Sequence, residues 1–494
     1  MLARAAASGT ETYGIGTFKQ LLDHNDPSKG TFNQKFYWNS QFWEGPGSPV
    51  VMMNPGEAAA DDAWGYLWDT TYSGLIAKKA KAATVVLEHR YFGDSSPYDT
   101  LTEDNLKYLT LDNAIQDNIY FAENVELPFD TNHSSNAHNA PWVLSGGSYS
   151  GALTSYTAAT EPDVFWAYYA SSAPVQIINN YWEYFTPIIE GGLPKNCTDD
   201  LDEIWNYLDV MNQMNLNEML DPIMEKFNLT HLRYEDFAAA LRVSLFYFQS
   251  NTYNMQTDYV QRMCDYIEGA ESGQKTSGNK GVGHLKAIEG LAKWFRDVRR
   301  PYACTDWGYA VNDLSCLDTW NPESLMYKDL RVRNNMSRQW QWIICNELGF
   351  FQTGAPNKSG VKSIVSRALN TDYSKHICEM YFPGKTWGLN KGDTDDALNK
   401  KLGGWNADHV QRLVTVVGEL DPWREASVAS DYRPGGPWNE NSDEHPVYVA
   451  KGSWHCTDMV LDVAYANEGL KEIVNKATDK VAAWVKDYYN QKKE

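Results

Sequence analysis

The chain has 494 residues, of which 43% are hydrophobic and 22% charged, so it is a globular protein with enough core material for two or more domains or one large elaborated domain. Its formal net charge of −21 leaves no basic face, which argues against nucleic acid or an anionic membrane as a partner and fits work in an acidic medium. No apolar window of about 18 residues predicts a membrane span, and the N-terminal residues lack the apolar core of a signal peptide.

The first part of the chain alternates between predicted strands and predicted helices. This order is typical of a parallel sheet whose strands are joined by crossover helices. We expect hairpins and strands at 32–43 and 48–54, a buried strand at 82–88, a helix within 108–127, a strand at 141–147, a helix at 149–162 and a strand at 165–174.

The middle of the chain has a different texture. From residue 178 to about 395 the apolar spacing is helical, with long polar connections, whereas strands return at 410–423 and 445–455 before a long amphipathic helix at 468–491. We therefore predict one α/β domain made of residues 1–177 and 396–494, interrupted by a helical insertion at 178–395.

The stretch "WVLSGGSYSGALTSY" (142–156) surrounds one serine with small residues. Ser148 follows a predicted buried strand and precedes a predicted helix, which is the setting of a nucleophile elbow. Gly146 and Ser150 are small enough for the sharp turn, although the last position of the G-x-S-x-G pattern is not glycine. The alternative is an ordinary glycine-rich loop.

A serine nucleophile needs a base and an acid, and on this kind of sheet they follow the serine in the order acid, then histidine. His455 comes just after the last predicted strand, whereas His445 precedes that strand and His409 lies earlier. Asp421 ends the preceding strand directly before a proline, and Glu419 is the second choice for the acid.

The oxyanion of the reaction needs two N–H donors, one of them the backbone N–H of Tyr149, directly after the serine. The second donor is expected in the turn "MMNPGEAAA" (52–60), from Gly56 or Glu57. The alternative is an ordinary Pro-Gly turn.

The cysteines are more consistent with disulfides in a secreted protein than with metal binding. No CxxC pair and no metal-ligand spacing occurs, so we expect neither metal nor cofactor. Six of the seven cysteines lie between 197 and 378, which allows 15 pairings and leaves Cys456 over. Sequons that permit glycosylation occur at Asn132, Asn196, Asn228, Asn335 and Asn357.

Four long motifs resemble one family of serine peptidases: "FKQLLDHNDPSKGTFNQKFYWN" (18–39), "EHRYFGDSSPY" (88–98), "GGSYSGAL" (146–153) and "DPWREASV" (421–428). The family is that of lysosomal prolyl carboxypeptidase and dipeptidyl peptidase II, and the match looks closest to its branch of fungal secreted acid prolyl endopeptidases. The resemblance covers nearly the whole chain.

The resemblance implies an α/β-hydrolase fold with a large, mostly helical insertion over the active site. It also implies a triad of Ser148, Asp421 and His455, and secretion. The implied activity is cleavage of peptides after proline at acidic pH. At pH 4 to 5 an ordinary histidine is mostly protonated, so acid activity requires either a lowered His455 pKa or a small active fraction.

The resemblance leaves the mode of cleavage open, because this chain has Asn54-Pro55-Gly56-Glu57 where animal members carry Asn-Glu-Gly-Asp. The fungal match favours an endopeptidase over a carboxypeptidase or dipeptidyl peptidase. An esterase on the same fold and a catalytically inactive binding module are further alternatives. By resemblance Glu57 and Trp340 are substrate-pocket candidates, and the aromatic run "RQWQWIICNELGFF" (338–351) adds Trp342, Phe350 and Phe351, each of which could instead be core.

Overall fold

The structure is a computed structural model that describes residues 11–255, 258–270, 280–334, 337–358, 360–407, 409–438 and 442–492. The described residues form an eight-stranded sheet in the order β1-β2-β4-β3-β5-β6-β9-β10 and a separate two-stranded sheet, β7-β8. The sheet is parallel from β4 to β10, whereas β2 is antiparallel to both β1 and β4. This is the α/β-hydrolase fold. The strands are β1 Tyr13–Leu21, β2 Thr31–Asn39, β3 Val50–Met53, β4 Ala83–Leu87, β5 Trp142–Gly147, β6 Ala167–Ser171, β7 Ile178–Asn180, β8 Gly349–Phe351, β9 Leu413–Gly418 and β10 Val447–Ala450.

The helices belong to two parts of the chain. Those before residue 178 and after residue 394 are α1 Tyr72–Ala80, α2 Glu103–Leu106, α3 Leu111–Asn124, α4 Tyr149–Thr160, α14 Asp395–Leu402, α15 Leu461–Ala464 and α16 Glu468–Gln491. The others are α5 Lys195–Gln213, α6 Asn217–Lys226, α7 Tyr234–Phe246, α8 Tyr259–Ile267, α9 His284–Trp294, α10 Leu325–Lys328, α11 Arg338–Ile343, α12 Thr371–Tyr381 and α13 Gly388–Lys391.

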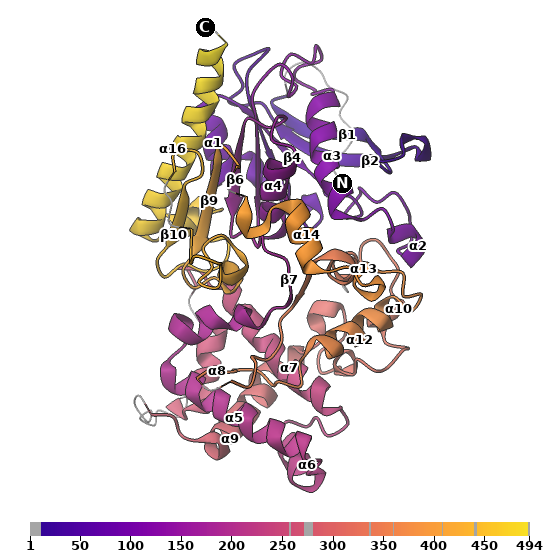
Figure 1. Ribbon diagram of the computed structural model, residues 1–494, viewed down its shortest axis with the longest axis vertical. Helices are drawn as coiled ribbons and strands as arrows, with labels where there is room; N and C mark the ends of the chain where they lie inside the picture. Colours follow the sequence, from indigo (N-terminus) through magenta and orange to yellow (C-terminus); the bar gives the residue numbers. More distant parts are fainter. Residues whose placement is uncertain are drawn as a thin grey trace.

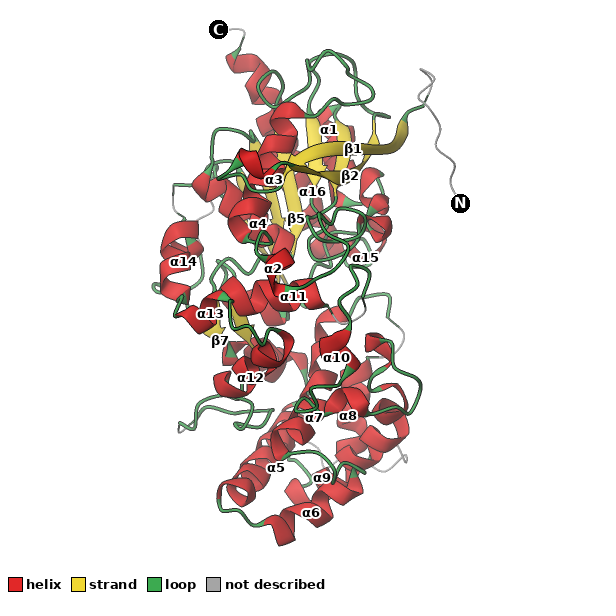
Figure 2. Ribbon diagram, turned by 90° about the vertical axis from the view of Figure 1, so that its right-hand side faces the viewer, coloured by secondary structure: helices red, strands yellow, loops and turns green. Residues whose placement is uncertain are grey.

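The parallel strands are apolar on both faces because each face is covered by helices. Side chains alternate along β3, so Met52 packs into the core with α3 and α4, whereas Val51 packs into the core with α1 and α16. Figure 2 shows the sheet between these layers. The alternation explains why these strands read as continuous apolar runs in the sequence.

Residues 178–395, which we call the helical segment, follow β6 in the chain and contain helices α5 to α13. Figures 1 and 2 show the two parts stacked along the long axis, with α5, α6 and α9 farthest from the sheet. The segment meets the sheet near the carboxyl end of β5, where Trp340 from α11 and Ser148 line one pocket.

Six of the cysteines form three disulfides, as the sequence predicted, and Cys456 is free. The pairing, which the sequence left open, joins cysteines that are consecutive along the chain. The pairs are Cys197–Cys264, Cys304–Cys316 and Cys345–Cys378. All three lie within the helical segment.

The sequons differ in how accessible their asparagines are. Asn132, Asn228 and Asn357 are exposed, whereas Asn196 is buried in α5 and Asn335 lies outside the described residues. Glycosylation stays a prediction, and the three exposed side chains are the ones that a glycosylating enzyme could reach in the folded protein.

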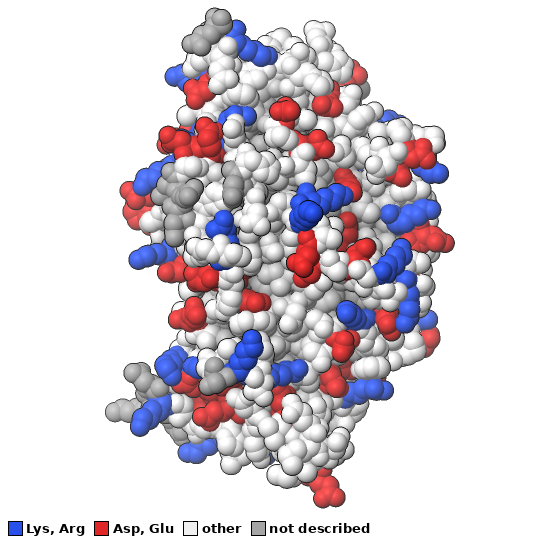
Figure 3. All heavy atoms as spheres, viewed as in Figure 1, with Lys and Arg blue, Asp and Glu red and all other residues white. Residues whose placement is uncertain are grey.

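The described surface carries both signs of charge. On the face in Figure 3, Lys and Arg are interspersed with Asp and Glu. Within the described residues, no helix combines the length and the apolar character needed to cross a bilayer.

Candidate active site

Ser148 lies on a sharp turn between β5 and α4, with φ 57° and ψ −129°. The glycines before it are needed because other atoms come very close. A Cβ at Gly146 would lie 2.5 Å from the backbone of Ser150, and a Cβ at Gly147 would lie 2.2 Å from the sulfur of Met459. The small residues around the serine therefore allow the strained turn that lifts its hydroxyl above the sheet.

The structure brings together the three residues that the sequence proposed as a triad. The Ser148 hydroxyl lies 2.8 Å from His455 Nε2, and His455 Nδ1 lies 2.9 Å from Asp421 Oδ1. Asp421 is fully buried and also accepts a hydrogen bond from the Trp423 N–H at 2.9 Å. A histidine held in this way has one nitrogen directed at the serine and the other fixed by a carboxylate.

The competing candidates lie elsewhere. Glu419 accepts a hydrogen bond from the Gly452 N–H at 2.9 Å instead of contacting the histidine. His445 is buried beside Thr415 near the start of β10, and His409 is exposed, with its Nε2 at 3.0 Å from the Ala159 carbonyl.

The electrostatics of the site favour a charged imidazole. Burial lowers the pKa of His455, but the charge of Asp421 and its hydrogen bond, with Cys456 adding to them, hold that pKa well above its ordinary value. The site therefore does not lower the pKa of His455, which was one of the two routes to acid activity that the sequence left open.

The turn after β3 lies against the serine, but its donors differ from the expectation. The Gly56 N–H donates to Asn54 Oδ1 at 2.8 Å, so Gly56 is not the free donor that the sequence suggested. Gly56 packs near Ser150 and the ring of Tyr149, which puts the next residue, Glu57, beside the nucleophile. The Tyr149 N–H opens α4 and so has no helical carbonyl to accept it.

The motif "EHRYFG" holds the loop after β3 through hydrogen bonds to Glu88. Glu88 is fully buried, and its carboxylate accepts hydrogen bonds from the Ala60 N–H at 2.9 Å, the Asp94 N–H at 2.9 Å and the Ser95 hydroxyl at 2.6 Å. Burial raises the pKa of Glu88. The loop that contains Gly56 is therefore fixed at its far end by a buried carboxyl group.

The next residue of the motif, His89, positions the ring of Tyr149. Its Nδ1 lies 2.8 Å from the Arg90 carbonyl and must donate to it, so Nε2 accepts from the Tyr149 hydroxyl at 3.1 Å. Burial lowers the pKa of His89 to about 4, which keeps the ring neutral over most of the pH range. The Tyr149 ring packs edge-on against Trp340, with centroids 5.3 Å apart.

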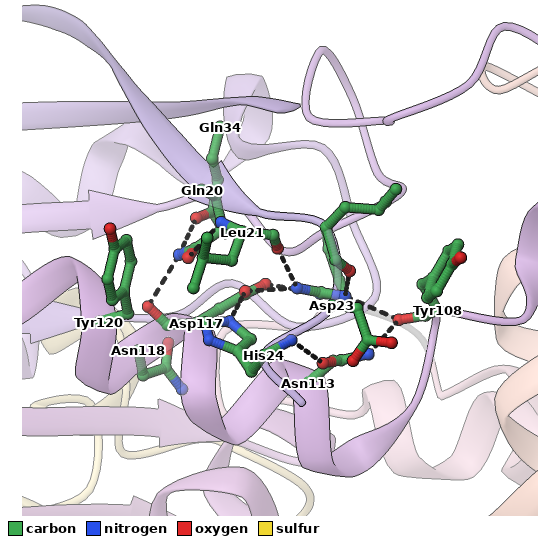
Figure 4. A network of polar contacts seen from close by, with 12 residues as sticks. Gln20, Leu21, Asp23, His24, Gln34, Tyr108, Asn113, Asp117, Asn118 and Tyr120 are labelled. Atoms are coloured by element: carbon green, nitrogen blue, oxygen red, sulfur yellow. Dashed lines mark hydrogen bonds and ion pairs between the residues drawn. The ribbon is translucent and has the colours of Figure 1, made fainter. Parts of the chain in front are cut away.

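Arg90 completes the motif as the centre of a buried polar network. Its five N–H groups all have acceptors: the carboxylate of Asp117, at 2.6 and 2.7 Å, and three backbone carbonyls from the β1 end and from Tyr108. Figure 4 shows His24 and Gln20 around Asp117. Because every donor is satisfied, this charge is a structural anchor rather than a ligand site.

A small pocket opens beside the serine. This serine pocket has a volume of about 130 Å³, which is below the roughly 300 to 1,000 Å³ usual for small-molecule sites and suits one compact side chain. Its lining residues come from the sheet domain and from the helical segment. They are Glu57, Ser148, Tyr149, Ala152, Pro174, Gln249, Trp340, Leu348, Phe350 and Trp423.

Three of the five predicted substrate-pocket residues line the serine pocket, and two, Trp342 and Phe351, do not. Glu57 and Trp340 line it, whereas Trp342 is buried in the core, where its indole N–H donates to the Leu109 carbonyl at 3.0 Å. Phe351 points away because side chains alternate along β8, and its neighbour Phe350 is the third residue that lines the pocket.

Two of the lining residues that the sequence did not predict, Trp423 and Gln249, are joined by a hydrogen bond. Trp423 was visible as the residue after Asp421-Pro422, and its indole N–H donates to Gln249 Oε1 at 2.9 Å. Gln249, which also accepts from the Tyr184 hydroxyl at 3.0 Å, carries no sequence signal. Together these contacts join the acid-bearing loop to the helical segment.

Two nearby tryptophans should respond differently to truncation. Trp340→Ala is expected to lower kcat/KM for the preferred substrate by about 10- to 200-fold while leaving the fold stable, because it removes one apolar pocket wall. Trp342→Ala is expected to lower the free energy of unfolding by about 3 to 5 kcal/mol, because it opens a cavity in the core. Denaturant unfolding and steady-state kinetics on both variants check this. The prediction would be contradicted if the two variants lost the same amount of stability and the same amount of kcat/KM.

In the described part of the chain, His, Cys, Asp and Glu side chains do not gather in groups of three or more that could hold a metal ion. The contacts at Ser148, His455 and Asp421 supply a hydroxyl nucleophile, a histidine base and a carboxylate beside a small aromatic pocket.

The chain matches known proteins over nearly its whole length. The model of the family described as "Serine carboxypeptidase S28" matches residues 20–473. Two proteins of Bipolaris victoriae, "Serine protease vicPa" and "Serine protease vicPb", are 37% and 36% identical, each over 97% of this chain and 90% of its own length. A "Probable extracellular serine carboxypeptidase" of Arthroderma benhamiae is 27% identical over 80% of this chain and 56% of its own length.

Proposed function

Since the chain belongs to the S28 family of serine peptidases, we propose that it cleaves peptides on the carboxyl side of proline through Ser148, His455 and Asp421. The observation that carries the proposal is the continuous contact from the Ser148 hydroxyl to His455 Nε2, and from His455 Nδ1 to Asp421, at the mouth of the serine pocket.

The mechanism follows from this order of contacts. His455 takes the proton of the Ser148 hydroxyl as the oxygen attacks the carbonyl of the substrate, and later gives it to the leaving amine. Asp421 keeps Nδ1 protonated and stabilises the imidazolium. The Tyr149 N–H, with the Glu57 N–H in place of Gly56, binds the oxyanion, and water then releases the acyl group.

The preference for proline rests on the serine pocket. A proline ring is compact, apolar and lacks an N–H, so it needs shape and apolar contact but no hydrogen-bond acceptor at its nitrogen. The rings of Tyr149, Trp340, Phe350 and Trp423 surround a space of about 130 Å³. This supports a small ring as the preferred group.

We propose internal cleavage over removal of terminal residues. Glu57 is the one carboxyl group among the residues that line the serine pocket, and burial raises its pKa, which weakens it as a charged partner for an N-terminal amine in an acidic medium. The relatives carry both kinds of name, serine protease and serine carboxypeptidase, and digestion of a peptide with internal prolines distinguishes the two modes.

We also propose that residues 178–395 act as a cap that completes the serine pocket, since Gln249, Trp340 and Phe350 come from this segment. The three disulfides within it favour an oxidising compartment. One relative is named as extracellular, and we propose secretion for this chain as well, with peptides or proteins as substrates.

An acidic working pH is supported by buried carboxyl groups rather than by the histidine. Burial raises the pKa of Glu347 from 4.5 to about 8 and that of Glu183 from 4.5 to about 7. Below pH 4.5 these groups are protonated in both the folded and the unfolded chain. Above it the unfolded chain releases protons that the fold retains, so stability falls as the pH rises toward 8.

Glu347→Gln is expected to flatten this dependence. The wild type should lose thermal stability between pH 5 and 8, and the variant should lose less, because a neutral amide replaces a carboxyl group that resists ionisation. The amide can still accept from the Leu111 N–H, which lies 2.8 Å from Glu347 Oε2. Thermal midpoints measured at several pH values check this, with the exposed Glu323→Gln as control. If the thermal midpoint of Glu347→Gln fell between pH 5 and 8 as steeply as that of Glu323→Gln, the prediction would be contradicted.

The function is tested by digesting a peptide of about 30 residues with internal prolines at pH 4 and pH 7, read by mass spectrometry, with Ser148→Ala as control. Internal cuts after proline that the control lacks support the proposal, whereas loss of only terminal residues moves the enzyme to the exopeptidases. Hydrolysis of a prolyl ester but not of the matching amide would identify an esterase instead.

A further inference from the structure

A second pocket lies in the helical segment, next to the serine pocket. It is lined by Arg242, Phe246, Trp340, Phe350, Phe351 and Tyr373, among others, and at about 280 Å³ it is larger than the serine pocket. Trp340 and Phe350 line both pockets, so the two pockets adjoin at these rings.

The charged groups of this pocket are not equivalent. Asp236 is satisfied by the protein, because its carboxyl oxygens accept from the Thr319 N–H at 3.1 Å, the Thr319 hydroxyl at 2.6 Å and the Tyr373 hydroxyl at 2.8 Å. Burial raises its pKa, which favours the neutral acid. Asp236 is therefore not a counter-ion for a neighbouring cation.

Arg242 is the opposite case. Its guanidinium donates to the Gln352 carbonyl at 2.7 Å and lies over the ring of Phe246 at 5.4 Å. Its Nε is buried without a hydrogen-bond partner, and among the described ion pairs none involves Arg242. Burial lowers its pKa, a sign that its charge is poorly compensated. A cation held in this way is stabilised by an anion that enters the pocket.

We propose that the second pocket is a substrate subsite in which Arg242 binds a carboxylate of the peptide being cleaved. A guanidinium presents paired N–H donors that match the two oxygens of a carboxylate. The apolar walls accommodate the rest of the residue that carries it. The carboxylate belongs either to an Asp or Glu side chain near the proline or to the C-terminus of a short substrate. The inference rests on the proposed peptidase function, since it concerns the same substrate.

The test uses matched peptides with one internal proline, in which a glutamate near the scissile bond is exchanged for glutamine, each with a free and an amidated C-terminus. One of the two carboxylates, the glutamate side chain or the free C-terminus, is expected to raise the kcat/KM of the wild type. The peptide that carries it should have a kcat/KM roughly 10- to 100-fold above that of the matched neutral peptide. Arg242→Gln should remove this difference and leave cleavage of the neutral, amidated peptide within about twofold. Arg242→Lys should retain part of it.

Arg233→Gln is the matched control, since Arg233 precedes the same helix and stacks on Trp320 outside the pocket. A preference that follows glutamate identifies the side chain, and one that follows the free C-terminus identifies the terminal carboxylate. Equal losses for charged and neutral peptides in Arg242→Gln would overturn the proposal.

The two proposals can fail separately. If the wild type cleaves none of the peptides, the peptidase proposal fails. Binding of the same peptides to the Ser148→Ala variant, measured by tryptophan fluorescence, still tests the role of Arg242. Tighter binding of the carboxylate peptide that is lost in the Ser148→Ala, Arg242→Gln double variant supports the subsite. Equal binding of charged and neutral peptides overturns it.

Discussion

Replacing Ser148 with alanine is expected to lower kcat by about a millionfold, because the hydroxyl that forms the acyl-enzyme is removed and only binding and oxyanion stabilisation remain. The fold should be unaffected. Both residues carry the same Cβ through the strained turn at φ 57°, and among the described residues the hydrogen bond of the serine hydroxyl is to His455. The measurement is turnover of a prolyl peptide together with the thermal midpoint.

A fluorophosphonate probe separates this serine from its neighbour. It should label the wild type and Ser150→Ala but not Ser148→Ala, because the Ser150 hydroxyl donates to the Gly147 carbonyl at 2.8 Å instead of facing the histidine. Labelling that survives in Ser148→Ala would mean that another residue is the nucleophile, and a wild type that resists the probe would favour an inactive binding module.

Replacing Asp421 with asparagine is expected to lower kcat by about ten-thousandfold, since an amide can donate to Nδ1 and thereby favour the wrong tautomer of His455. It should also change the pH profile. The carboxylate raises the histidine pKa, so its removal lowers that pKa and moves the acidic limb of kcat/KM to lower pH. A full profile of kcat/KM against pH measures both effects.

Glu419→Gln is the control for this prediction, because Glu419 is the other acid at the end of β9. The amide oxygen of glutamine can still accept from the Gly452 N–H, so turnover and the acidic limb should stay close to those of wild type. A large loss in Glu419→Gln, with little change in Asp421→Asn, would reassign the acid to Glu419.

The sequence was a good guide where chain order itself sets geometry. Strand β5, the glycines and helix α4 are adjacent in the chain, so their packing around Ser148 follows from local sterics. His455 and Asp421 are far away in sequence but each follows a parallel strand, and parallel strands end at the same edge of a sheet.

The sequence was a poor guide where the direction of a side chain decides. Trp340 and Trp342 are two positions apart on α11, so they point to different sides of the helix, and only the first reaches the serine pocket. Phe350 and Phe351 alternate across β8 for the corresponding reason in a strand. The Gly56 donor is lost to an Asx turn, in which the Asn54 side chain accepts from the backbone N–H two residues later.

Arg242 and Gln249 lie beyond sequence reasoning for a different reason. Both are polar residues on or next to a helix of the helical segment, where most such residues face solvent. What distinguishes them is the cavity that each one lines, and a cavity is made by elements far apart in the chain.

The disulfides divide the molecule into parts with different sensitivity to reducing agents. Among the described residues every cross-link begins and ends within residues 178–395, and each closes a loop of 67, 12 or 33 residues. A thiol reductant therefore releases conformational entropy in this segment alone and leaves the sheet with Ser148 and His455 untouched. Moderate reduction should thus relax discrimination between substrates before it removes the reactive serine.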